Sequence, residues 1–328
     1  MFQKAARPTR IFFAADIHGS QPTFRKFVAA AAFYDCDVLV FGGDLMGKAL
    51  VPIVRTGDTY RAHFDGRDHV FEHDGLAPFA RAVETPGYYW KVVDDDEYEA
   101  TRDDPFAQIG LFQELASDRL AGWLRYAEER LAGTGVRMYL TGGNDDDPVV
   151  LETLDRHEGD HVRASEGSIV DLDGEHTMIT VGLSTETPWD TPREATEDEI
   201  AERIEASVGA VPDLGRCVFN LHCPPKDTLI DTCLKLRPSA TSGGMPEPIR
   251  DGGRFLTTGG GSVAVREAIG RYQPVVGLHG HIHESLGRVR VGRTPCFNPG
   301  SEYLQGQLQG WIVMLRKGTV KAYQHTSG

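Results

Sequence analysis

The sequence is short of basic residues. Lysine and arginine total 34 against 48 aspartates and glutamates, which gives a formal net charge of −14. Nucleic acids and anionic membranes are usually held by broad basic surfaces. The deficit therefore argues against a protein that works through such a surface. It does not argue against a phosphorylated substrate, because a bound pair of metal ions would reverse the local field.

Cysteines are also few, and none forms a Cys-x-x-Cys pair, so the sequence argues against zinc fingers and redox pairs. The odd number of scattered thiols fits reduced cysteines in the cytoplasm. A secretory signal is not recognisable, because the apolar run at residues 11–15 is short and meets Asp16 directly. No apolar run approaches the length of a membrane span. We therefore expect a cytoplasmic protein.

The 328 residues, 40% of them hydrophobic, are enough for a large core. Apolar runs at 10–15 and 37–41, with a helical pattern at 23–33 between them, predict a βαβ unit with parallel strands. The pattern then decays into a polar, acidic segment. We interpret the chain as a single domain, 1–328, with an insertion at about 46–105.

Periodic apolar residues predict the remaining elements. Strands are expected at 136–140, 169–172, 177–181, 217–221 and 274–278, and helices at 106–131, after the capping box Thr196–Glu199, and at 262–272. A long loop is expected at 226–261, and a final group of antiparallel strands from 288 onward.

Five of the predicted strands end in glycine- or proline-marked turns that carry side chains able to bind a metal. These side chains are, in chain order, Asp16 and His18, Asp44, Asn144, His222, and His281 and His283. Ligands bind outside the carboxyl ends of strands in open α/β sheets. Oxygen and nitrogen donors gathered there suit hard or borderline metals. If the last strand continues through the His-x-His pair, both of its imidazoles face the same side.

In this pattern the chain resembles the calcineurin-like metallophosphoesterases. The resemblance runs from residue 10 to about 315 and lies in Asp16-x-His18, Gly43-Asp44, Gly143-Asn144, His222 and Gly280-His281-x-His283. Asn298-Pro299-Gly300-Ser301 looks like a further signature of the family. The resemblance implies an α/β (α+β) fold, a two-sheet β-sandwich flanked by helices in four αββα layers.

The resemblance also implies two divalent metal ions, with Mn²⁺, Fe, Zn²⁺ and Ni²⁺ as the candidates. One ion would be held by Asp16, His18, Asp44 and His283, and the second by Asn144, His222 and His281, with Asp44 as the bridge. A hydroxide shared by two metals can attack a phosphate ester in line. The expected substrate is a phosphodiester or an activated phosphomonoester, such as a nucleotide or another small molecule.

We expect Asn144, His222 and Asp145 to take part in catalysis. Many family members carry histidine after the asparagine, as general acid or as support for the leaving group, where this chain has Asp145. A carboxylate beside two metals should stay ionised and be a poor proton donor. Turnover of esters with poor leaving groups should therefore be weak. His157, His161 and His176 are alternative proton donors that the sequence does not place.

Two other interpretations remain open. Residues 42–49 nearly spell a P-loop, but Ala49 stands where the loop needs serine or threonine, and Asp44 would repel the phosphates. The chain could also be a catalytically weak scaffold that keeps this fold and binds a partner protein. Seven intact metal-ligand positions argue against a pure scaffold.

Overall fold

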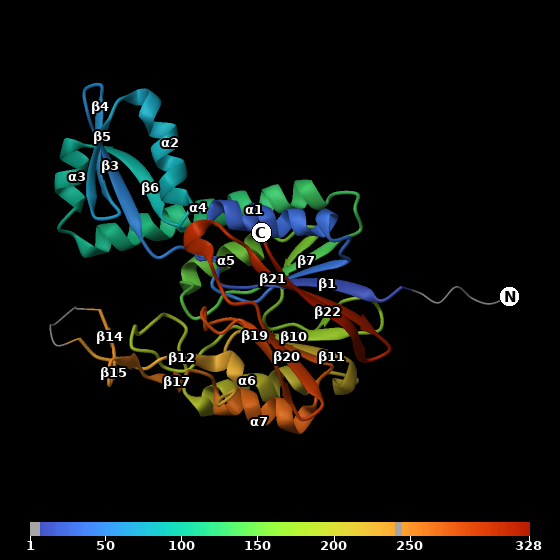
Figure 1. Ribbon diagram of the computed structural model, residues 1–328. Coiled ribbons are helices and arrows are strands. Elements are labelled where there is room, and N and C mark those ends of the chain that lie inside the picture. The colour runs from blue at the N-terminus through green and yellow to red at the C-terminus, as the bar shows by residue number, and fades with distance from the viewer. Residues whose placement is uncertain (1–6, 240–244) are drawn as a thin grey trace.

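Two six-stranded sheets lie face to face in the computed structural model, which describes residues 7–239 and 245–328 (Figure 1). The first sheet has the strand order β22-β21-β1-β2-β7-β8 and the second β19-β20-β18-β11-β10-β9. Helices cover the two outer faces, which gives four layers (Figure 1). The predicted two-sheet sandwich flanked by helices is confirmed.

The first sheet has a parallel centre and an antiparallel edge. Its parallel strands are β1 (Thr9–Ala14), β2 (Val38–Phe41), β7 (Arg137–Leu140) and β8 (Val162–Ala164). Two C-terminal strands, β21 (Gln309–Arg316) and β22 (Thr319–Ser327), extend it beside β1. The helices α1 (Gln21–Phe33), α4 (Pro105–Leu131) and α5 (Pro148–Arg156) contribute to the core on its outer side.

The second sheet repeats this plan. Its parallel strands are β10 (Thr177–Val181), β11 (Cys217–Leu221), β18 (Val276–Leu278) and β20 (Thr294–Asn298). Antiparallel strands lie at its two edges, β9 (Val170–Asp171) and β19 (Gly287–Val291). The helices α6 (Glu197–Val208), which begins with the predicted capping box, and α7 (Val263–Tyr272) pack on its outer face.

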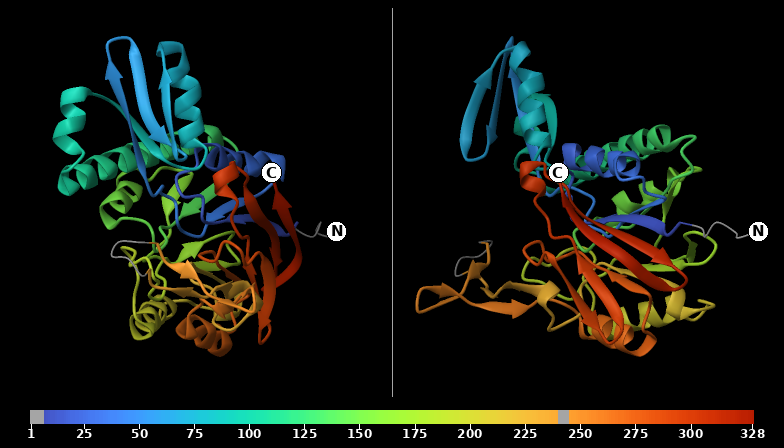
Figure 2. Two further views of the ribbon diagram at one scale, coloured as in Figure 1. Left: turned by 60° about the vertical axis from the view of Figure 1, so that its left-hand side comes forward. Right: turned by 45° about the vertical axis from the view of Figure 1, so that its right-hand side comes forward.

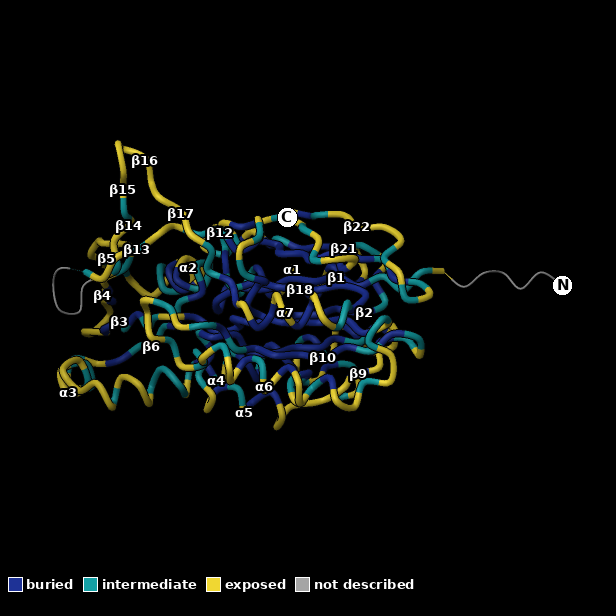
Figure 3. The backbone as a smooth tube through the Cα atoms, turned by 90° about the horizontal axis from the view of Figure 1, so that it is seen from below, coloured by how far each residue is buried: buried dark blue, intermediate teal, exposed yellow. Residues whose placement is uncertain are grey.

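Alternation along the strands builds both cores. Phe12 packs toward the helices of the first sheet, whereas its neighbour Phe13 packs between the two sheets. Successive side chains of a strand point to opposite faces, and both faces are covered here. The central strands are therefore apolar at nearly every position, as parallel sheets usually are. Figure 3 shows these strands as the buried centre of the molecule.

The segment after β2 forms a small body of its own. A four-stranded sheet is built from β3 (Leu50–Thr56), β4 (Thr59–Phe64), β5 (Arg67–Phe71) and β6 (Tyr89–Asp94). It is flanked by α2 (His73–Glu84) and α3 (Asp95–Thr101) and has a separate apolar core. It stands away from the sandwich in Figures 1 and 2. We refer to residues 46–105 as the insertion. That this segment is an insertion into the domain stays a prediction.

Two expectations were wrong. The segment expected as a loop at 226–261 contains short strand pairs, because strands of two or three residues leave no readable pattern. The elements there are β12 (Thr232–Leu234), β13 (Leu236–Arg237), β14 (Glu247–Pro248), β15 (Arg250–Asp251), β16 (Arg254–Phe255) and β17 (Thr257–Gly259). The antiparallel strands expected from 288 onward are present as two hairpins, β19–β20 and β21–β22. They are not one group, since the first hairpin joins the second sheet and the second hairpin joins the first sheet.

Three short 3-10 helices complete the described elements, η1 (Leu214–Arg216), η2 (Leu229–Asp231) and η3 (Tyr303–Gln305). Within residues 7–239 and 245–328, no helix combines the length and the apolar character that a membrane crossing requires.

Candidate metal centre

The seven predicted ligands meet at one edge of the sandwich. Each follows the carboxyl end of a parallel strand: β1, β2 and β7 in the first sheet, and β11 and β18 in the second. Asp16, His18, Asp44, Asn144 and His222 are buried. His281 and His283 are only partly buried, so the cluster is reached from their side. The prediction that these donors converge therefore agrees with the structure, while their role as ligands stays a proposal.

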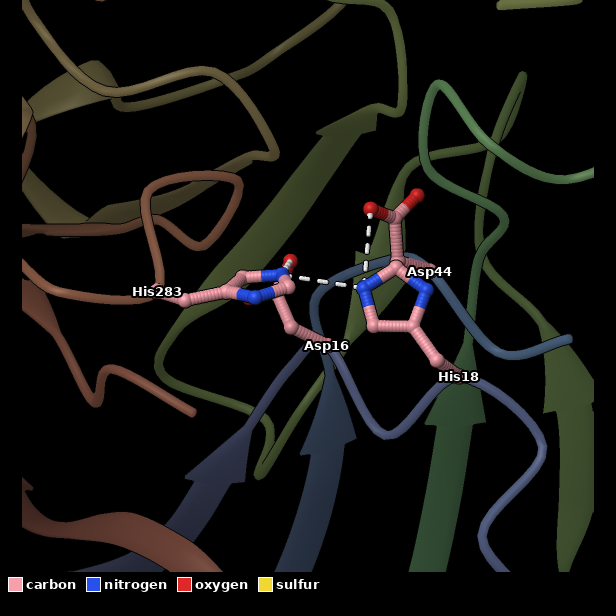
Figure 4. Close-up of side chains that lie close together, drawn as sticks. All are labelled: Asp16, His18, Asp44 and His283. Atoms are coloured by element: carbon pink, nitrogen blue, oxygen red, sulfur yellow. Dashed lines mark hydrogen bonds and ion pairs between the residues drawn. The ribbon is translucent and has the colours of Figure 1, made fainter. Parts of the chain in front are cut away.

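Four of them form a first donor set (Figure 4). One ligand atom from each of Asp16, His18, Asp44 and His283 lies within 4.8 Å of all the others. His18 Nε2 is 2.9 Å from His283 Nε2 and 3.6 Å from Asp44 Oδ2. His283 Nε2 is 3.6 Å from Asp16 Oδ1. Two carboxylates and two imidazoles thus point at one small volume.

A second donor set lies beside the first. Asn144 Oδ1 is 3.0 Å from His222 Nε2 and 2.8 Å from His281 Nδ1. Its amide nitrogen donates to Thr191 Oγ1 at 2.8 Å, which keeps the oxygen turned toward the imidazoles. Asp44 Oδ2 is 3.5 Å from His222 Nε2 and so belongs to both sets.

The protonation of His222 tests whether this arrangement suits a cation. Its Nδ1 lies 2.8 Å from the carbonyl oxygen of Gly42, so Nδ1 carries a proton. Its Nε2 faces two acceptor oxygens, from Asp44 and Asn144, which either a second ring proton or a metal ion at Nε2 would satisfy. Burial favours the neutral ring, yet the Asp44 carboxylate raises the pKa of His222 to about 9. The site therefore attracts positive charge, and its oxygen and imidazole donors fit a divalent metal.

Strained backbone conformations direct several of the predicted ligand side chains into the cluster. Four of the seven predicted ligands have left-handed φ angles: Asp16 (57°), His18 (42°), Asp44 (57°) and His281 (67°). Non-glycine residues adopt this region rarely, and such strain concentrates at functional sites. At His281 the turn also overturns an expectation, because β18 ends at Leu278 and the His-x-His pair is not in a strand. Its imidazoles therefore reach different donor sets instead of sharing one face.

Two glycines let the backbone approach the donors. A Cβ at Gly143 would overlap Asp44 Oδ1 and His222 Nε2, and one at Gly280 would overlap Asp16 Oδ2. The backbone N–H of His281 then donates to both Asp16 oxygens at 3.0 and 3.1 Å. Glycine at both positions is thus a steric requirement of the cluster.

Asp146 is a positioning residue that the sequence analysis missed. It is fully buried and accepts the backbone N–H groups of Leu45, Met46 and Gly143 at 2.7–2.9 Å. It therefore ties the loop after β2 to the loop after β7. Burial and the neighbouring Asp44 charge raise the pKa of Asp146 to about 7 in spite of these three donors. Only its place in the run Asp145–Asp147 hinted at a role.

Asn298 fixes the loop that carries the His-x-His pair, as Asp146 fixes the loops after β2 and β7. Its side-chain amide donates to the carbonyls of Ile230, Gly280 and Ile282 at 3.0–3.2 Å. Ser301, in the same signature, donates its hydroxyl to the carbonyl of Asp16 at 2.5 Å. These contacts hold the signature close to the turns that carry the predicted ligands.

Asp145 is paired with Lys48, a partner that the sequence did not predict. Lys48 Nζ forms an ion pair with Asp145 Oδ2, which also lies 3.5 Å from His18 Nδ1. Burial and the Asp44 charge raise the pKa of Asp145, and Lys48 opposes this shift. In the sequence, Lys48 stood out only as the lysine of the incomplete P-loop pattern at residues 42–49. In the structure it pairs with the Asp145 carboxylate.

The alternative proton donors lie elsewhere. His157 ends α5 and contacts the carbonyl of Thr153, and His161 contacts the carbonyl of Val136. His176 pairs with Asp173 and precedes β10, at the amino ends of the strands. The predicted ligands follow the carboxyl ends, so His176 lies at the opposite edge of the sheet.

Comparisons with known proteins agree with this fold. No protein-family model and no curated protein matches the sequence. Among solved structures, one aligns with a TM-score of 0.59 and 16% identity over 98% of both chains. Protein TT1561 of Thermus thermophilus aligns with a TM-score of 0.54 and 14% identity, again over 98% of both chains. Likeness at this identity shows a shared fold.

A third structure is more distant. An archaeal phosphodiesterase covers 98% of this chain and 100% of its own, with 11% identity and a TM-score of 0.33. A score this low supports no inference about the present chain.

Proposed function

We propose that this chain, which has the fold of the calcineurin-like metallophosphoesterases, is a binuclear metal-dependent phosphoesterase. The observation that carries the proposal is the place of Asp44. One of its oxygens lies 3.6 Å from His18 Nε2 and 3.5 Å from His222 Nε2, between two donor sets. A carboxylate shared in this way would set the separation of two bound cations.

The two donor sets support the division of ligands that the resemblance implies. Asp16, His18, Asp44 and His283 would hold one ion, and Asp44, Asn144, His222 and His281 the other. When bound, two divalent ions lower the pKa of a water molecule to near neutrality and neutralise charge on the phosphoryl group. Manganese, iron, zinc and nickel all suit this mixture of oxygen and imidazole donors.

The protein's own groups orient the ester. His222 is fixed by the carbonyl of Gly42, and the Asn144 oxygen is fixed by Thr191, so neither donor needs to reorganise during the reaction. Lys48 holds a positive charge beside the cluster, where a non-bridging oxygen of the substrate can pair with it. Asp145 keeps that ammonium group in place.

Asp145 itself is the wrong group to protonate a leaving group. Burial and the Asp44 charge raise the pKa of Asp145, but the ion pair with Lys48 and the charge of bound metals favour the carboxylate, which has no proton to give. The ester oxygen must therefore leave as an anion or take its proton from water. This favours phosphodiesters with a stable leaving group and activated phosphomonoesters.

The decisive experiment is hydrolysis of bis(p-nitrophenyl) phosphate by metal-free protein supplied with Mn²⁺, Fe²⁺, Zn²⁺ or Ni²⁺. We expect metal-dependent release of p-nitrophenolate, and a loss of at least about a hundredfold in kcat/KM for Asp44→Asn, which weakens both donor sets. Asp68→Asn is the matched control, because Asp68 is exposed on the insertion.

Thermal unfolding of each variant separates loss of the site from loss of the fold. If none of the four metals supports hydrolysis in folded protein, the proposal fails. The alternative of a scaffold that binds a partner protein then becomes the better account.

A further inference from the structure

A cavity of about 630 Å³ lies beside the candidate metal centre. Its walls come from β3 and β6 of the insertion, from α3, and from the first half of α4. Figure 1 labels these elements, which lie on the side of the molecule that carries the insertion. Its size is that of a small-molecule site, about 300–1,000 Å³.

Lys48 joins the cavity to the metal centre. It lines the cavity, and its ammonium group pairs with Asp145. Asp145 Oδ2 lies 3.5 Å from His18 Nδ1, and the backbone N–H of Asp145 donates to Asp44 Oδ1 at 3.0 Å. Two paired side chains, Lys48 and Asp145, thus connect the cavity to the two donor sets. An ester bound at the metals would direct one substituent along this pair toward the cavity.

The cavity has an apolar wall. Leu50 and Val93 come from the insertion, and Ile109 and Phe112 come from α4. Phe112 packs edge-on against the buried ring of Tyr89, so its position is fixed. Ile109 is 53% exposed although it is a large apolar residue. This wall would stabilise an aromatic ring or a short aliphatic group of a ligand.

The same cavity carries three cations in a strongly acidic chain: Lys48, Lys91 and Arg102. Lys91 pairs with Glu97 at 2.9 Å, and Arg102 pairs with Glu99 at 3.1 Å and with Asp103 at 3.2 Å. All five of these side chains are more than a third exposed, so the pairs are weak and can yield to a ligand. The lining carboxylate, Asp147, is already engaged by Val149 N–H and the Gln113 amide.

We propose that this cavity is a specificity pocket for the non-reacting substituent of the substrate, an apolar ring or chain that bears a second anionic group. The proposal rests on the proposed phosphoesterase function. It assigns the apolar part to the wall formed by Ile109 and Phe112, and the second anion to Lys91 and Arg102.

Three diesters that release the same p-nitrophenolate test the pocket. They are methyl, phenyl and 4-carboxyphenyl p-nitrophenyl phosphate, so the leaving group is constant and only the second substituent changes. We expect kcat/KM to rise from methyl to phenyl by about tenfold through burial of the ring. A further rise of about fivefold is expected for the 4-carboxyphenyl ester, through pairing with the two cations.

Variants divide the two parts of the pocket. Ile109→Trp fills the space from an exposed position and should abolish the advantage of the phenyl over the methyl ester. Its control is Phe106→Trp, on the same helix but outside the lining. The double variant Lys91→Met/Arg102→Gln should remove only the advantage of the 4-carboxyphenyl ester. Its control is Lys321→Met, on the distant strand β22.

Calorimetric binding of 4-carboxyphenylphosphonate and phenylphosphonate, whose P–C bond is not hydrolysed, gives a readout that does not need turnover. We expect tighter binding of the carboxylated compound to the wild type, and no difference in the double variant. If hydrolysis occurs but the three esters and all variants behave alike, the pocket assignment is overturned while the phosphoesterase function stands. If nothing is hydrolysed, the proposed function fails, and equal binding of the two compounds would overturn the pocket as well.

Discussion

His18 and His283, which are 265 residues apart in the chain, bring their Nε2 atoms to 2.9 Å from each other. Two ring nitrogens at this distance can share one proton or, after a small separation, one metal ion. Burial and the nearby Lys48 charge lower the pKa of His18 well below its usual value. The ring is therefore held in the neutral form, which is the form that binds metals.

Metal binding should stabilise the folded protein. A ligand that binds only the native state adds about 2.7 kcal/mol at a concentration one hundred times its Kd. We therefore expect Mn²⁺ to raise the Tm of the metal-free protein in a concentration-dependent way. His283→Gln should shrink this rise, because it removes one of the four donors of the first set. Differential scanning calorimetry over a series of MnCl₂ concentrations makes the measurement.

The matched variant is His63→Gln, which alters an exposed histidine paired with Asp68 on the insertion. It should keep the full response to Mn²⁺. Equal responses from the two variants would show that His283 does not bind the ion.

Lys48 should matter for the substrate more than for the fold. Lys48→Met is expected to lower kcat/KM for bis(p-nitrophenyl) phosphate about 10- to 100-fold, the cost of one charge-assisted contact. Lys48→Arg should keep much of the activity. The double variant Lys48→Met/Asp145→Asn then shows whether the loss comes from a missing substrate contact or from a stranded Asp145 carboxylate.

A loss that persists in the double variant assigns Lys48 to the substrate. Recovery in the double variant would restrict Lys48 to neutralising Asp145. An unchanged kcat/KM in Lys48→Met would contradict both roles.

The leaving group should control the rate on monoesters. Because the Asp145 carboxylate is paired with Lys48, it cannot protonate an alkoxide as it departs. We expect phenyl phosphate to be hydrolysed much faster than propyl phosphate under the same metal loading. Asp145→His should narrow the difference by supplying a titratable proton near neutral pH. Comparable wild-type rates on the two esters would refute the leaving-group argument.

The sequence predicted the donors because each follows a recognisable apolar strand and a glycine or proline turn. The positions of Asp44, Asn144 and His222 at strand ends could be derived from that local pattern. The pairing of Lys48 with Asp145 could not, because it depends on which loops the sheet order brings together. Spacing alone also misjudged His281, whose left-handed backbone is a property of the folded loop.

The C-terminal strands and the insertion were harder to predict from the sequence, because their pairing also depends on long-range contacts. Nothing local to strands β19 to β22 says which of the two sheets each joins. The four strands of the insertion are mixed with polar residues, because one small sheet with a thin core needs few apolar positions. Long-range packing, which the sequence does not display, decided these elements.

A carboxylate of α6, Glu197, binds the first N–H groups of α7 and should make stability depend on pH. Glu197 accepts hydrogen bonds from Ser262 Oγ at 2.5 Å, Val263 N–H at 2.8 Å and Ala264 N–H at 2.9 Å. Burial would raise its pKa, but these donors lower the pKa of Glu197 below its ordinary value. A carboxylate whose pKa is lower in the folded state adds stability above the unfolded pKa, about 4.3. That contribution is lost as the pH falls through the folded pKa.

Glu197→Gln should therefore cost about 1–2 kcal/mol of unfolding free energy near neutral pH. The difference from the wild type should shrink as the pH falls below about 4. Urea unfolding at neutral and acidic pH measures it, with Glu202→Gln as the control, since Glu202 is exposed on the same helix α6. If Glu197→Gln lowers the free energy of unfolding equally at both pH values, the loss comes from the altered shape of the side chain and not from the charge of Glu197.

Gly143 offers the sharpest steric test of the metal centre. A methyl group there would overlap Asp44 Oδ1 and the backbone nitrogen of Asp44 on one side and His222 Nε2 on the other. None of these atoms can withdraw freely, because Asp44 Oδ1 accepts the N–H of Asp145 and His222 Nδ1 is held by the carbonyl of Gly42. Gly143→Ala should therefore separate the two donor sets.

We expect Gly143→Ala to weaken Mn²⁺ binding by at least about tenfold, a loss of about 1.4 kcal/mol, as measured by calorimetric titration. The same substitution at Gly122, within α4, meets no close neighbour except the end of the Arg125 side chain. Gly122→Ala should instead stabilise the helix by about 0.5–1 kcal/mol and leave metal binding unchanged. If the two variants bind Mn²⁺ equally well, the close approach of the Gly143 backbone to Asp44 and His222 is not what shapes the site.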